Sequence, residues 1–286
     1  MQAFAYAEAF SRNIGWVTRQ EQESLRRKRV AIAGLGGVGG VHLLTLCRLG
    51  ISAFSLADFD TFDLVNFNRQ AGANLGTLGQ GKLDVMARQA CDINPEVEIR
   101  GFAEGVTAGN LDAFLDGVDL YIDGLDFFAF ETRQAVFAAC AAKGIPAITA
   151  APLGMGAAVL NFMPGGLSFE EYFRFQDGPV QEQPLRFLLG LAPARLQMGY
   201  LVDPTAVDLA NQKGPSTILA CQLCAGVAAT EALKILLGRG PVRAAPRGYH
   251  FDAYRNRLAL TWRPRGNRNP LQRLFIALAR RKLGLS

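Results

Sequence analysis

The sequence predicts an α/β fold in which helices cover both faces of a doubly wound, mostly parallel β-sheet. Three observations lead to this prediction. Short apolar runs of strand length alternate with longer segments whose apolar residues recur at helical spacing. The runs are apolar throughout, as in strands buried on both faces of a parallel sheet. Half of the 286 residues are hydrophobic and only 19% are charged, which provides a sizeable core and excludes a disordered chain.

The predicted elements begin with a helical arm. Charged, amphipathic residues over 8–29 predict one or two short helices before the core. Beyond the arm, strands are expected at 30–33, 53–57, from 97 onward, at 120–123 and at 147–150, and helices at 42–49, 82–92 and 129–143. This alternation is the pattern of βαβ units, in which each helix crosses from one parallel strand to the next.

The second half of the chain is less regular. The Pro and Gly content and the aromatic residues Phe169, Tyr172, Phe173 and Phe175 predict an insertion or lid over the sheet at about 165–217. An apolar core helix is expected at 218–237 and a terminal antiparallel hairpin within 248–262. A basic amphipathic helix is expected where Leu271, Leu274, Phe275 and Leu278 recur among arginines.

These elements divide the chain into three parts. They are an N-terminal helical arm over 1–29, a central α/β domain over 30–266 and a basic amphipathic tail over 267–286. We expect neither a secretory signal nor a membrane-spanning helix, because no uninterrupted apolar run reaches about 18 residues. Five widely spread cysteines do not form a disulfide framework, so a cytoplasmic setting is expected.

The net charge of +5 is unevenly distributed. Twelve basic residues and one acidic residue lie between Arg239 and the C-terminus, so the rest of the chain is acidic. A basic tail on an acidic body favours a polyanion, an acidic partner or a membrane surface as its binding partner. A solvated basic surface is an equally good interpretation.

The clearest local motif is GLGGVGG, which covers 34–40. Gly34, Gly36 and Gly39 fit G-x-G-x-x-G directly between a predicted strand and a predicted helix, with Gly37 inside the motif. Glycines allow the tight turn and a close approach of the backbone to phosphate, and the helix N-terminus favours the negative charge. Asp58 ends the second strand, where an acid hydrogen-bonds ribose hydroxyls in Rossmann-like folds. NAD-dependent dehydrogenases share these two features, so they leave ATP and NAD as alternatives.

The segment after Asp58 is more specific. It reads DFDTFDLVNFNRQ and contains Asp60, Asn66, Arg69 and Gln70, and LGQGK follows with Lys82. The ordered set G-x-G-G-x-G, D-x-D-x(5)-N-x-x-R-Q and G-x-x-K resembles the ThiF/MoeB/HesA family of ubiquitin-activating-enzyme-like adenylyltransferases. Residues 5–150 carry the resemblance, and helix 218–237 resembles a later family helix. The central domain is thus expected to be a ThiF-type ATP-binding domain.

The resemblance also implies roles for single residues. Arg12, in FSRNIG, resembles an arginine that reaches the ATP phosphates of the partner subunit, which implies a homodimer. Asp126, in IDGLDFF, matches an aspartate that serves the Mg²⁺ ion. A carboxylate that attacks the α-phosphorus of ATP gathers negative charge, which fixed cations and Mg²⁺ stabilise. Arg12, Arg69 and Lys82 suit this task, while Asp58 holds the ribose and Asn66 and Gln70 position the nucleotide.

Three departures from the family pattern limit these inferences. Cys221 and Cys224 form the only CxxC pair, whereas structural zinc requires four ligands, so a structural zinc is not expected. No cysteine lies within 165–217, where thioester-forming relatives carry one, and Cys47, Cys91 and Cys140 are expected in the core. Phe127 follows Asp126 where the family has Asn, and the next arginine is Arg133, so the pocket for the carboxylate substrate differs.

The leading hypothesis is an enzyme that adenylates the C-terminal carboxylate of a small ubiquitin-like protein or peptide and releases pyrophosphate. A tRNA threonylcarbamoyladenosine dehydratase-like enzyme is an alternative, because the basic tail suits a tRNA partner. A non-catalytic nucleotide-binding scaffold of the same family is a second alternative, and a dinucleotide-dependent oxidoreductase is a third. The substrate and the acceptor of the acyl-adenylate do not follow from the sequence.

Overall fold

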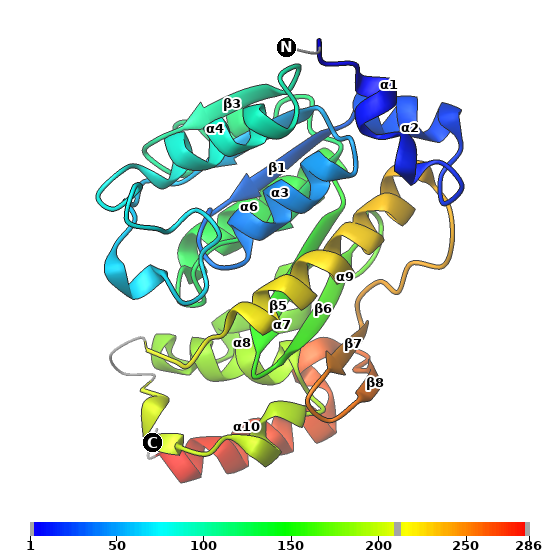
Figure 1. Cartoon of the computed structure of the whole chain (residues 1–286). Coiled ribbons are helices and arrows are strands. Elements are labelled where there is room, and N and C mark those ends of the chain that lie inside the picture. The colour runs from blue at the N-terminus through cyan, green and yellow to red at the C-terminus, as the bar shows by residue number, and fades with distance from the viewer. Residues whose placement is uncertain (1–2, 209–212, 284–286) are drawn as a thin grey trace.

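The computed structural model describes residues 3–208 and 213–283 and contains one eight-stranded mixed sheet (Figure 1). The strand order is β3-β2-β1-β4-β5-β6-β7-β8. The strands are β1 (Arg29–Ala33), β2 (Ala53–Ala57), β3 (Glu98–Phe102), β4 (Leu120–Asp123), β5 (Ala147–Leu153), β6 (Gly156–Phe162), β7 (Arg247–Asp252) and β8 (Arg257–Trp262). The first five are parallel and the last three antiparallel, which confirms the predicted doubly wound sheet and the terminal hairpin.

The helices cover both faces of this sheet. They are α1 (Tyr6–Ala9), α2 (Arg19–Arg26), α3 (Gly39–Arg48), α4 (Lys82–Ile93), α5 (Leu111–Phe114), α6 (Phe130–Lys143), α7 (Phe169–Phe173), α8 (Gln183–Leu191), α9 (Ile218–Leu237) and α10 (Pro270–Leu283). One apolar core lies between the sheet and α3, α4 and α9, and a second lies on the other face with α5, α6, α7 and α8. Figure 1 shows α3, α4 and α9 side by side along the first face.

The strand order creates a switch point between β1 and β4. From β1 the chain proceeds outward through β2 and β3, then returns to place β4 on the other side of β1. The loops that leave β1 and β4 therefore diverge at the carboxyl edge of the sheet, and ligands of open α/β sheets bind in the crevice between such loops. This edge also receives the end of β2, so Gly34, Asp58 and Gly124 come together there.

The sequence analysis assigned no element to β6. Its residues are buried along the whole strand, but Pro152 precedes it and reads as a strand breaker. In the structure Pro152 belongs to the last part of β5, where pairing with β4 has already ended at Thr149. A missing N–H on that side removes no ladder hydrogen bond, so the proline is tolerated and β5 continues into the hairpin with β6.

The segment predicted as an insertion or lid contains α7, α8 and short 3-10 turns, with residues 209–212 outside the described part. The four aromatic side chains on which the prediction rested, those of Phe169, Tyr172, Phe173 and Phe175, are buried. Phe169 stacks on Phe137 of α6 with ring centroids 4.3 Å apart and lies 5.5 Å from the ring of Phe162 in β6. The aromatic cluster thus forms part of the second core and covers that face of the sheet.

The helix α9 has the length and apolar composition of a membrane span, with a mean hydropathy of 1.5, and 44% of that window is buried. Small side chains face the protein, and α9 packs against α3, β5 and β6. Gln222, Gly226 and Thr230 form the exposed side, spaced by one turn. These contacts are those of a core helix, as the sequence analysis expected.

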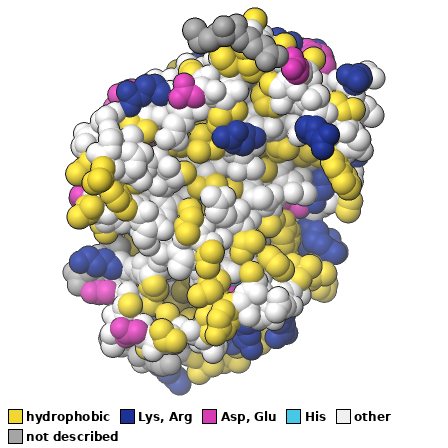
Figure 2. All heavy atoms as spheres, in the orientation of Figure 1, with side chains coloured by type: hydrophobic (Ala, Val, Ile, Leu, Met, Phe, Trp, Pro, Cys, Tyr) yellow, Lys and Arg dark blue, Asp and Glu magenta, His cyan; other side chains and the backbone are white. Residues whose placement is uncertain are grey.

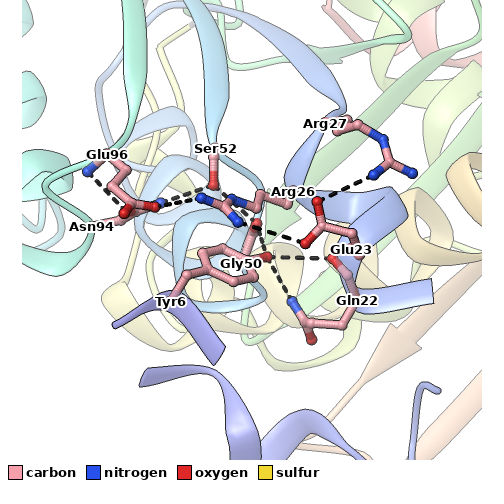
Figure 3. Close-up of polar contacts among 9 residues, drawn as sticks. All are labelled: Tyr6, Gln22, Glu23, Arg26, Arg27, Gly50, Ser52, Asn94 and Glu96. Atoms are coloured by element: carbon pink, nitrogen blue, oxygen red, sulfur yellow. Dashed lines mark hydrogen bonds and ion pairs between the residues drawn. The ribbon is translucent and has the colours of Figure 1, made fainter. Parts of the chain in front are cut away.

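The helical arm packs against the end of α3 that lies far from the glycine motif (Figure 3). Tyr6 donates its hydroxyl to the Gly50 carbonyl at 2.6 Å, and the Gln22 amide donates to the Tyr6 hydroxyl at 2.9 Å. Arg26 reaches across to Glu96 at 2.8 Å. α2 begins at a capping box, in which the Thr18 hydroxyl accepts from the Glu21 N–H and the Glu21 carboxylate accepts from the Thr18 N–H.

All five cysteines are free thiols. Cys47, Cys140, Cys221 and Cys224 are buried, as expected, but Cys91 is exposed, so its assignment to the core was wrong. Cys91 follows Ala90, the last buried residue of α4, and thus lies on the outward side of that helix.

His42 is buried in α3, and among residues 3–208 and 213–283 neither of its ring nitrogens finds a hydrogen-bond partner. Burial lowers the pKa of His42 to about 4 from its ordinary value of 6.5. Between about pH 6.5 and about pH 4, His42 binds a proton in the unfolded chain but not in the folded chain. The free energy of unfolding therefore falls as the pH drops through this range. At 1.36 kcal/mol for each pKa unit, this group removes about 3 kcal/mol from the free energy of unfolding.

We therefore expect His42→Leu to flatten the pH dependence. Urea unfolding of the wild type and the variant at pH 7 and pH 4 measures the effect, because other acid-sensitive groups contribute equally to both proteins. The variant should lose about 3 kcal/mol less than the wild type over this range. Equal losses would show that His42 does not carry the effect.

Candidate active site

The glycine motif forms a tight turn between β1 and α3, close to the backbone of the loop that follows β4. Gly34 has a positive φ of 83°, and a Cβ atom there would lie 2.3 Å from the Gly124 carbonyl oxygen. A Cβ on Gly39 would lie 1.7 Å from the Gly34 carbonyl oxygen, and one on Gly124 would lie 2.8 Å from the Gly39 Cα. These approaches are possible only without side chains, and they aim the N-terminus of α3 at the switch point.

Asp58 ties the end of β2 to this turn. Its Oδ2 accepts a hydrogen bond from the Leu35 N–H at 2.6 Å, and its Oδ1 accepts from the Asp60 N–H at 2.8 Å. Burial raises the pKa of Asp58, while these two N–H groups and Lys82 act in the opposite direction. The carboxylate therefore fixes the turn and stays half-buried beside it, where an acid that accepts ribose hydroxyls is needed.

Lys82 begins α4 and is buried, with 6% of its surface exposed. Its Nζ lies 3.0 Å from Oδ2 of Asp60, whose side chain is more than half exposed, and its N–H donates to the Asp60 carbonyl at 2.9 Å. A buried ammonium requires a charged partner because desolvation is costly. Here the partner carboxylate remains accessible to solvent.

The loop between β2 and α4 carries the remaining polar residues to the glycine turn. Asn66 is buried and accepts from the Asp63 N–H at 2.9 Å, which caps a short 3-10 turn, Leu64–Asn66. Past this turn, a Cβ on Gly36 would lie 3.6 Å from Nε2 of Gln70, and one on Gly37 would lie 3.5 Å from Cγ of Arg69. The side chains of Arg69 and Gln70 thus border the glycine turn.

Gln70 and Arg69 differ in how they are held. Gln70 is buried, and its Oε1 has no hydrogen-bond partner within the described part of the chain. An unpaired buried carbonyl is costly, so a donor from a ligand would satisfy it. The Arg69 guanidinium donates to the Val65 carbonyl at 3.1 Å and to the Asn68 side chain at 3.0 Å and is partly exposed.

The loop after β4 is shaped by a buried ion pair that the sequence analysis did not identify. Arg133 is 2% exposed, and its Nε donates to Oδ2 of Asp123, the last residue of β4, at 2.8 Å. The guanidinium also donates to the carbonyls of Leu125, Asp126 and Phe127 at 2.9, 2.8 and 3.2 Å. Arg133 therefore holds the loop and is committed to that role, so it is not available to bind a substrate carboxylate.

Asp126 lies in this loop with its side chain exposed. Its Oδ1 accepts from the Phe128 N–H at 2.9 Å, which fixes the carboxylate at the start of the turn into α6. Gly124, two residues earlier, contacts Gly34 and Gly39 as described above. Asp126 is thus carried to the same edge of the sheet as the glycine turn.

Arg12 is the one predicted site residue that the structure does not bring to this edge. It is exposed on a 3-10 turn, Ser11–Asn13, and the adjacent Asn13 donates to the Leu49 carbonyl at 3.3 Å. Leu49 caps the C-terminal end of α3, whereas the glycine turn lies at the N-terminal end. Ten residues of helix separate the two ends by about 15 Å.

Two further contacts near the glycine turn come from α9 and from the segment just before it. Cys221 lies against the glycine turn, since a Cβ on Gly37 would lie 3.1 Å from its Sγ. Burial raises the pKa of the Cys221 thiol, and a Ser216 hydrogen bond and the charge of Arg69 only partly offset this. Asn68 donates to the Ser216 carbonyl at 3.0 Å. These long-range contacts have no local sequence signal, and the sequence analysis missed them.

The Cys221–Cys224 pair lies within α9 and is buried. In the part of the chain that the structure describes, no three His, Cys, Asp or Glu side chains gather where they could hold a metal ion. Burial raises the pKa of the Cys224 thiol as well.

Comparisons with known proteins show which family and which fold the chain shares. The family model described as "ThiF family" matches residues 10–273. The chain is 36% identical over 150 residues to the tRNA threonylcarbamoyladenosine dehydratase of Bacillus subtilis (strain 168), covering 52% of this chain and 57% of that protein. It is 31% identical over 143 residues to the sulfur carrier protein ThiS adenylyltransferase of Escherichia coli (strain K12), covering 50% and 56%. The chain thus spans somewhat more than half the length of these curated relatives.

Solved structures show the same fold at lower sequence identity. The crystal structure of E. coli MccB with MccA-N7isoASN superposes with a TM-score of 0.68. The identity is 17%, and the match covers 94% of this chain and 75% of that one.

Proposed function

The chain belongs to the ThiF family, and from this premise we propose that it is an ATP-dependent adenylyltransferase that activates a carboxylate and releases pyrophosphate. The proposed substrate is the C-terminal carboxylate of a small ubiquitin-like protein or peptide. A relative named as an adenylyltransferase of the sulfur carrier protein ThiS supports this substrate class. We propose a cytoplasmic location.

One observation carries the proposal. Three features from separate segments meet at the edge of the sheet where the loops after β1 and β4 diverge. They are the glycine turn, the aspartate Asp58 and the two cationic side chains of Arg69 and Lys82. A dinucleotide oxidoreductase would require the glycines and Asp58 but would leave Lys82 and Arg69 without a task. A triphosphate requires all of them, because its negative charge increases as pyrophosphate leaves.

The proposed reaction follows from these positions. An oxygen of the substrate carboxylate attacks the α-phosphorus of ATP, and the bond from that phosphorus to the oxygen bridging to the β-phosphate breaks. The electron pair leaves with pyrophosphate, and an acyl-adenylate remains. We assign Asp58 to the ribose hydroxyls, Gln70 to nucleotide positioning with Asn66 holding its loop, and Lys82 and Arg69 to the phosphate charge. A carboxylate is already ionised at neutral pH, so no general base is required.

We propose Asp126 as the Mg²⁺ ligand. Mg²⁺ is commonly held by one or two carboxylates together with substrate phosphates and water, rather than by an all-protein cage. An exposed aspartate beside the phosphate-binding turn fits this pattern. When bound, the ion would neutralise phosphate charge.

Two alternatives have specific support. A dehydratase-type reaction on a tRNA base is favoured by the relative named as a tRNA threonylcarbamoyladenosine dehydratase and by the basic C-terminal region. A non-catalytic scaffold is favoured by Phe127 and by Arg133, which is committed to the loop. Lys82 argues against a scaffold. It is a buried cation whose acidic partner, Asp60, is exposed to solvent, and a scaffold needs no such cation.

Exchange of labelled pyrophosphate into ATP tests the function. The purified chain is incubated with ATP, Mg²⁺ and either synthetic peptides ending in Gly-Gly or a tRNA that carries threonylcarbamoyladenosine. Exchange with the peptides supports the leading proposal, and exchange or AMP release with the tRNA alone supports the dehydratase. Tight ATP binding without exchange in either arm would favour the scaffold.

We further propose a homodimer in which Arg12 of one subunit completes the site of the other. Arg12 is exposed and lies near the C-terminal end of α3, which is about 15 Å from the glycine turn at the other end, so we assign its presentation at the turn to a second copy. Exposed Leu64, Val65 and Leu75 in the loop beside the site would be covered by that copy.

Complementation between two inactive variants tests this arrangement. Arg12→Ala and Lys82→Ala chains are co-expressed, and the exchange activity of the mixture is measured. Half of the randomly assembled dimers are mixed, and each has one intact site, so about a quarter of wild-type activity should return. If Arg12 acts within its own chain, no mixed dimer has an intact site and activity stays absent.

A further inference from the structure

The outward side of α10 carries an aligned row of leucines. Leu271, Leu274 and Leu278 are 46, 53 and 52% exposed, and their spacing of three and four residues places them on one side of the helix. We call these three residues the leucine stripe. The inward side buries Gln272 and Ile276 and packs against Leu185 and Leu189 of α8.

This helix is therefore apolar on two sides. A surface helix normally buries one apolar side and presents polar residues to water. Single exposed leucines are common and need no explanation. Three aligned leucines on one helix form a continuous strip, which marks a surface that binds something. Since α8 already occupies the inward side, the leucine stripe is left for a partner outside the described chain.

The charges around the stripe are positive. Arg273 and Arg281 are exposed on the same helix. From Arg239 onward the sequence has one acidic residue, Asp252, and it is fully buried. Three arginines of the region are paired with acids from elsewhere: Arg239 with Glu21 at 3.3 Å, Arg268 with Asp177 at 2.8 Å and Arg280 with Glu182 at 2.9 Å. The remaining exposed arginines give the surface a net positive charge.

The hairpin just before α10 has the same character. Leu258, Leu260 and Trp262 alternate along the edge strand β8 and are 57, 55 and 60% exposed. Arg257 and Arg265, at either end of this run, are exposed too. Figure 2 shows hydrophobic side chains gathered over the lower part of the molecule, with Lys and Arg side chains at the margin.

We propose that α10 binds the surface of a lipid bilayer that contains anionic lipids, with the leucine stripe in the headgroup layer. Interfacial helices combine apolar side chains that enter the boundary with arginines that contact anionic headgroups. Arg273 and Arg281 extend to the headgroups while their aliphatic stems cover apolar surface. A nucleic-acid backbone would use the arginines but would leave the leucines in water, so the bilayer accounts for both. The proposal does not depend on the proposed enzymatic function.

Vesicle co-sedimentation of the full chain tests the proposal. Sucrose-loaded vesicles of phosphatidylcholine alone are compared with vesicles that contain about 30% phosphatidylserine, at low and at physiological salt. Partitioning onto the anionic vesicles should be at least about tenfold stronger and should weaken with salt.

Two variants separate the contributions of leucine and arginine. Leu271→Gln/Leu274→Gln/Leu278→Gln and Arg273→Glu/Arg281→Glu should each reduce partitioning onto anionic vesicles by about tenfold or more. Trp16→Gln/Val202→Gln is the matched control, because both side chains are highly exposed outside this region, at 85 and 96%. The control should bind as the wild type does, and circular dichroism checks that each variant remains folded.

Three results would overturn the proposal. The first is equal partitioning of the wild type onto neutral and anionic vesicles. The second is undiminished binding by the folded leucine variant. The third is binding to tRNA instead of to either kind of vesicle, measured by fluorescence anisotropy. If the arginine variant loses this tRNA binding and the leucine variant keeps it, the surface is assigned to nucleic acid.

Discussion

Gly36→Ala is expected to weaken ATP binding by at least about tenfold while the protein remains folded, whereas Gly39→Ala should strongly destabilise the fold. A Cβ on Gly36 meets nothing closer than Nε2 of Gln70 at 3.6 Å, so the apo fold accepts it. The new methyl group nevertheless lies on the turn where the backbone must approach phosphate closely. A Cβ on Gly39 would lie 1.7 Å from a backbone oxygen that cannot move aside, which we expect to cost at least about 3 kcal/mol.

Urea unfolding and titration with a non-hydrolysable ATP analogue measure the two effects separately. Gly226→Ala in α9 is the matched control, because a Cβ there has open space and the helix favours alanine. It should leave both quantities unchanged or raise stability slightly. Normal nucleotide affinity in folded Gly36→Ala would remove this turn from the proposed binding site.

Lys82→Ala should lower the rate of pyrophosphate exchange by about 10² to 10³, the usual effect of removing one group that stabilises charge in a transition state. Asp60, its partner, is 55% exposed in its side chain, so water solvates the carboxylate that is left behind. The fold should therefore survive, and ATP affinity should fall by less than the exchange rate, because the charge on the phosphates grows during the reaction.

The control for this variant is Lys143→Ala. Lys143 also forms an ion pair, with Asp112 at 2.9 Å, but it lies at the end of α6 away from the site. It should keep wild-type exchange and wild-type ATP affinity. Equal losses in exchange rate and affinity for Lys82→Ala would mean that the lysine binds the nucleotide uniformly and has no special role in the reaction.

Local patterns were sufficient for most of the sheet. The strands at 53–57 and 120–123 were predicted with their observed bounds, since each is a mostly apolar run with an aspartate directly after it or at its end, Asp58 and Asp123. The strand β6 could not be assigned. The effect of Pro152 on the sheet depends on whether a neighbouring strand would accept a hydrogen bond from an N–H at that position. Cys91 was misplaced for a similar reason, since helical spacing alone does not fix which side of α4 a borderline residue faces.

The candidate site divides in the same way. The residues of the glycine turn, Asp58 and Lys82 carry recognisable spacing, and the structure gathers them at one edge. Two contacts arise from tertiary packing, so no local sequence pattern predicts them. Cys221 contacts Gly37 from a distant segment, and Arg133 pairs with Asp123 across a loop. Whether Arg12 reaches a site depends on a second chain.

The buried Arg133–Asp123 pair has a consequence for substrate choice. Because the guanidinium donates to three consecutive carbonyls, it fixes the path of the main chain through 125–127. Phe127 and Phe128 are partly buried and pack against the second core, and the ring centroid of Phe127 lies 5.2 Å from that of Phe187 in α8. Under the proposed function, a change of side chain at 127 would therefore alter the packing of the second core together with the substrate pocket.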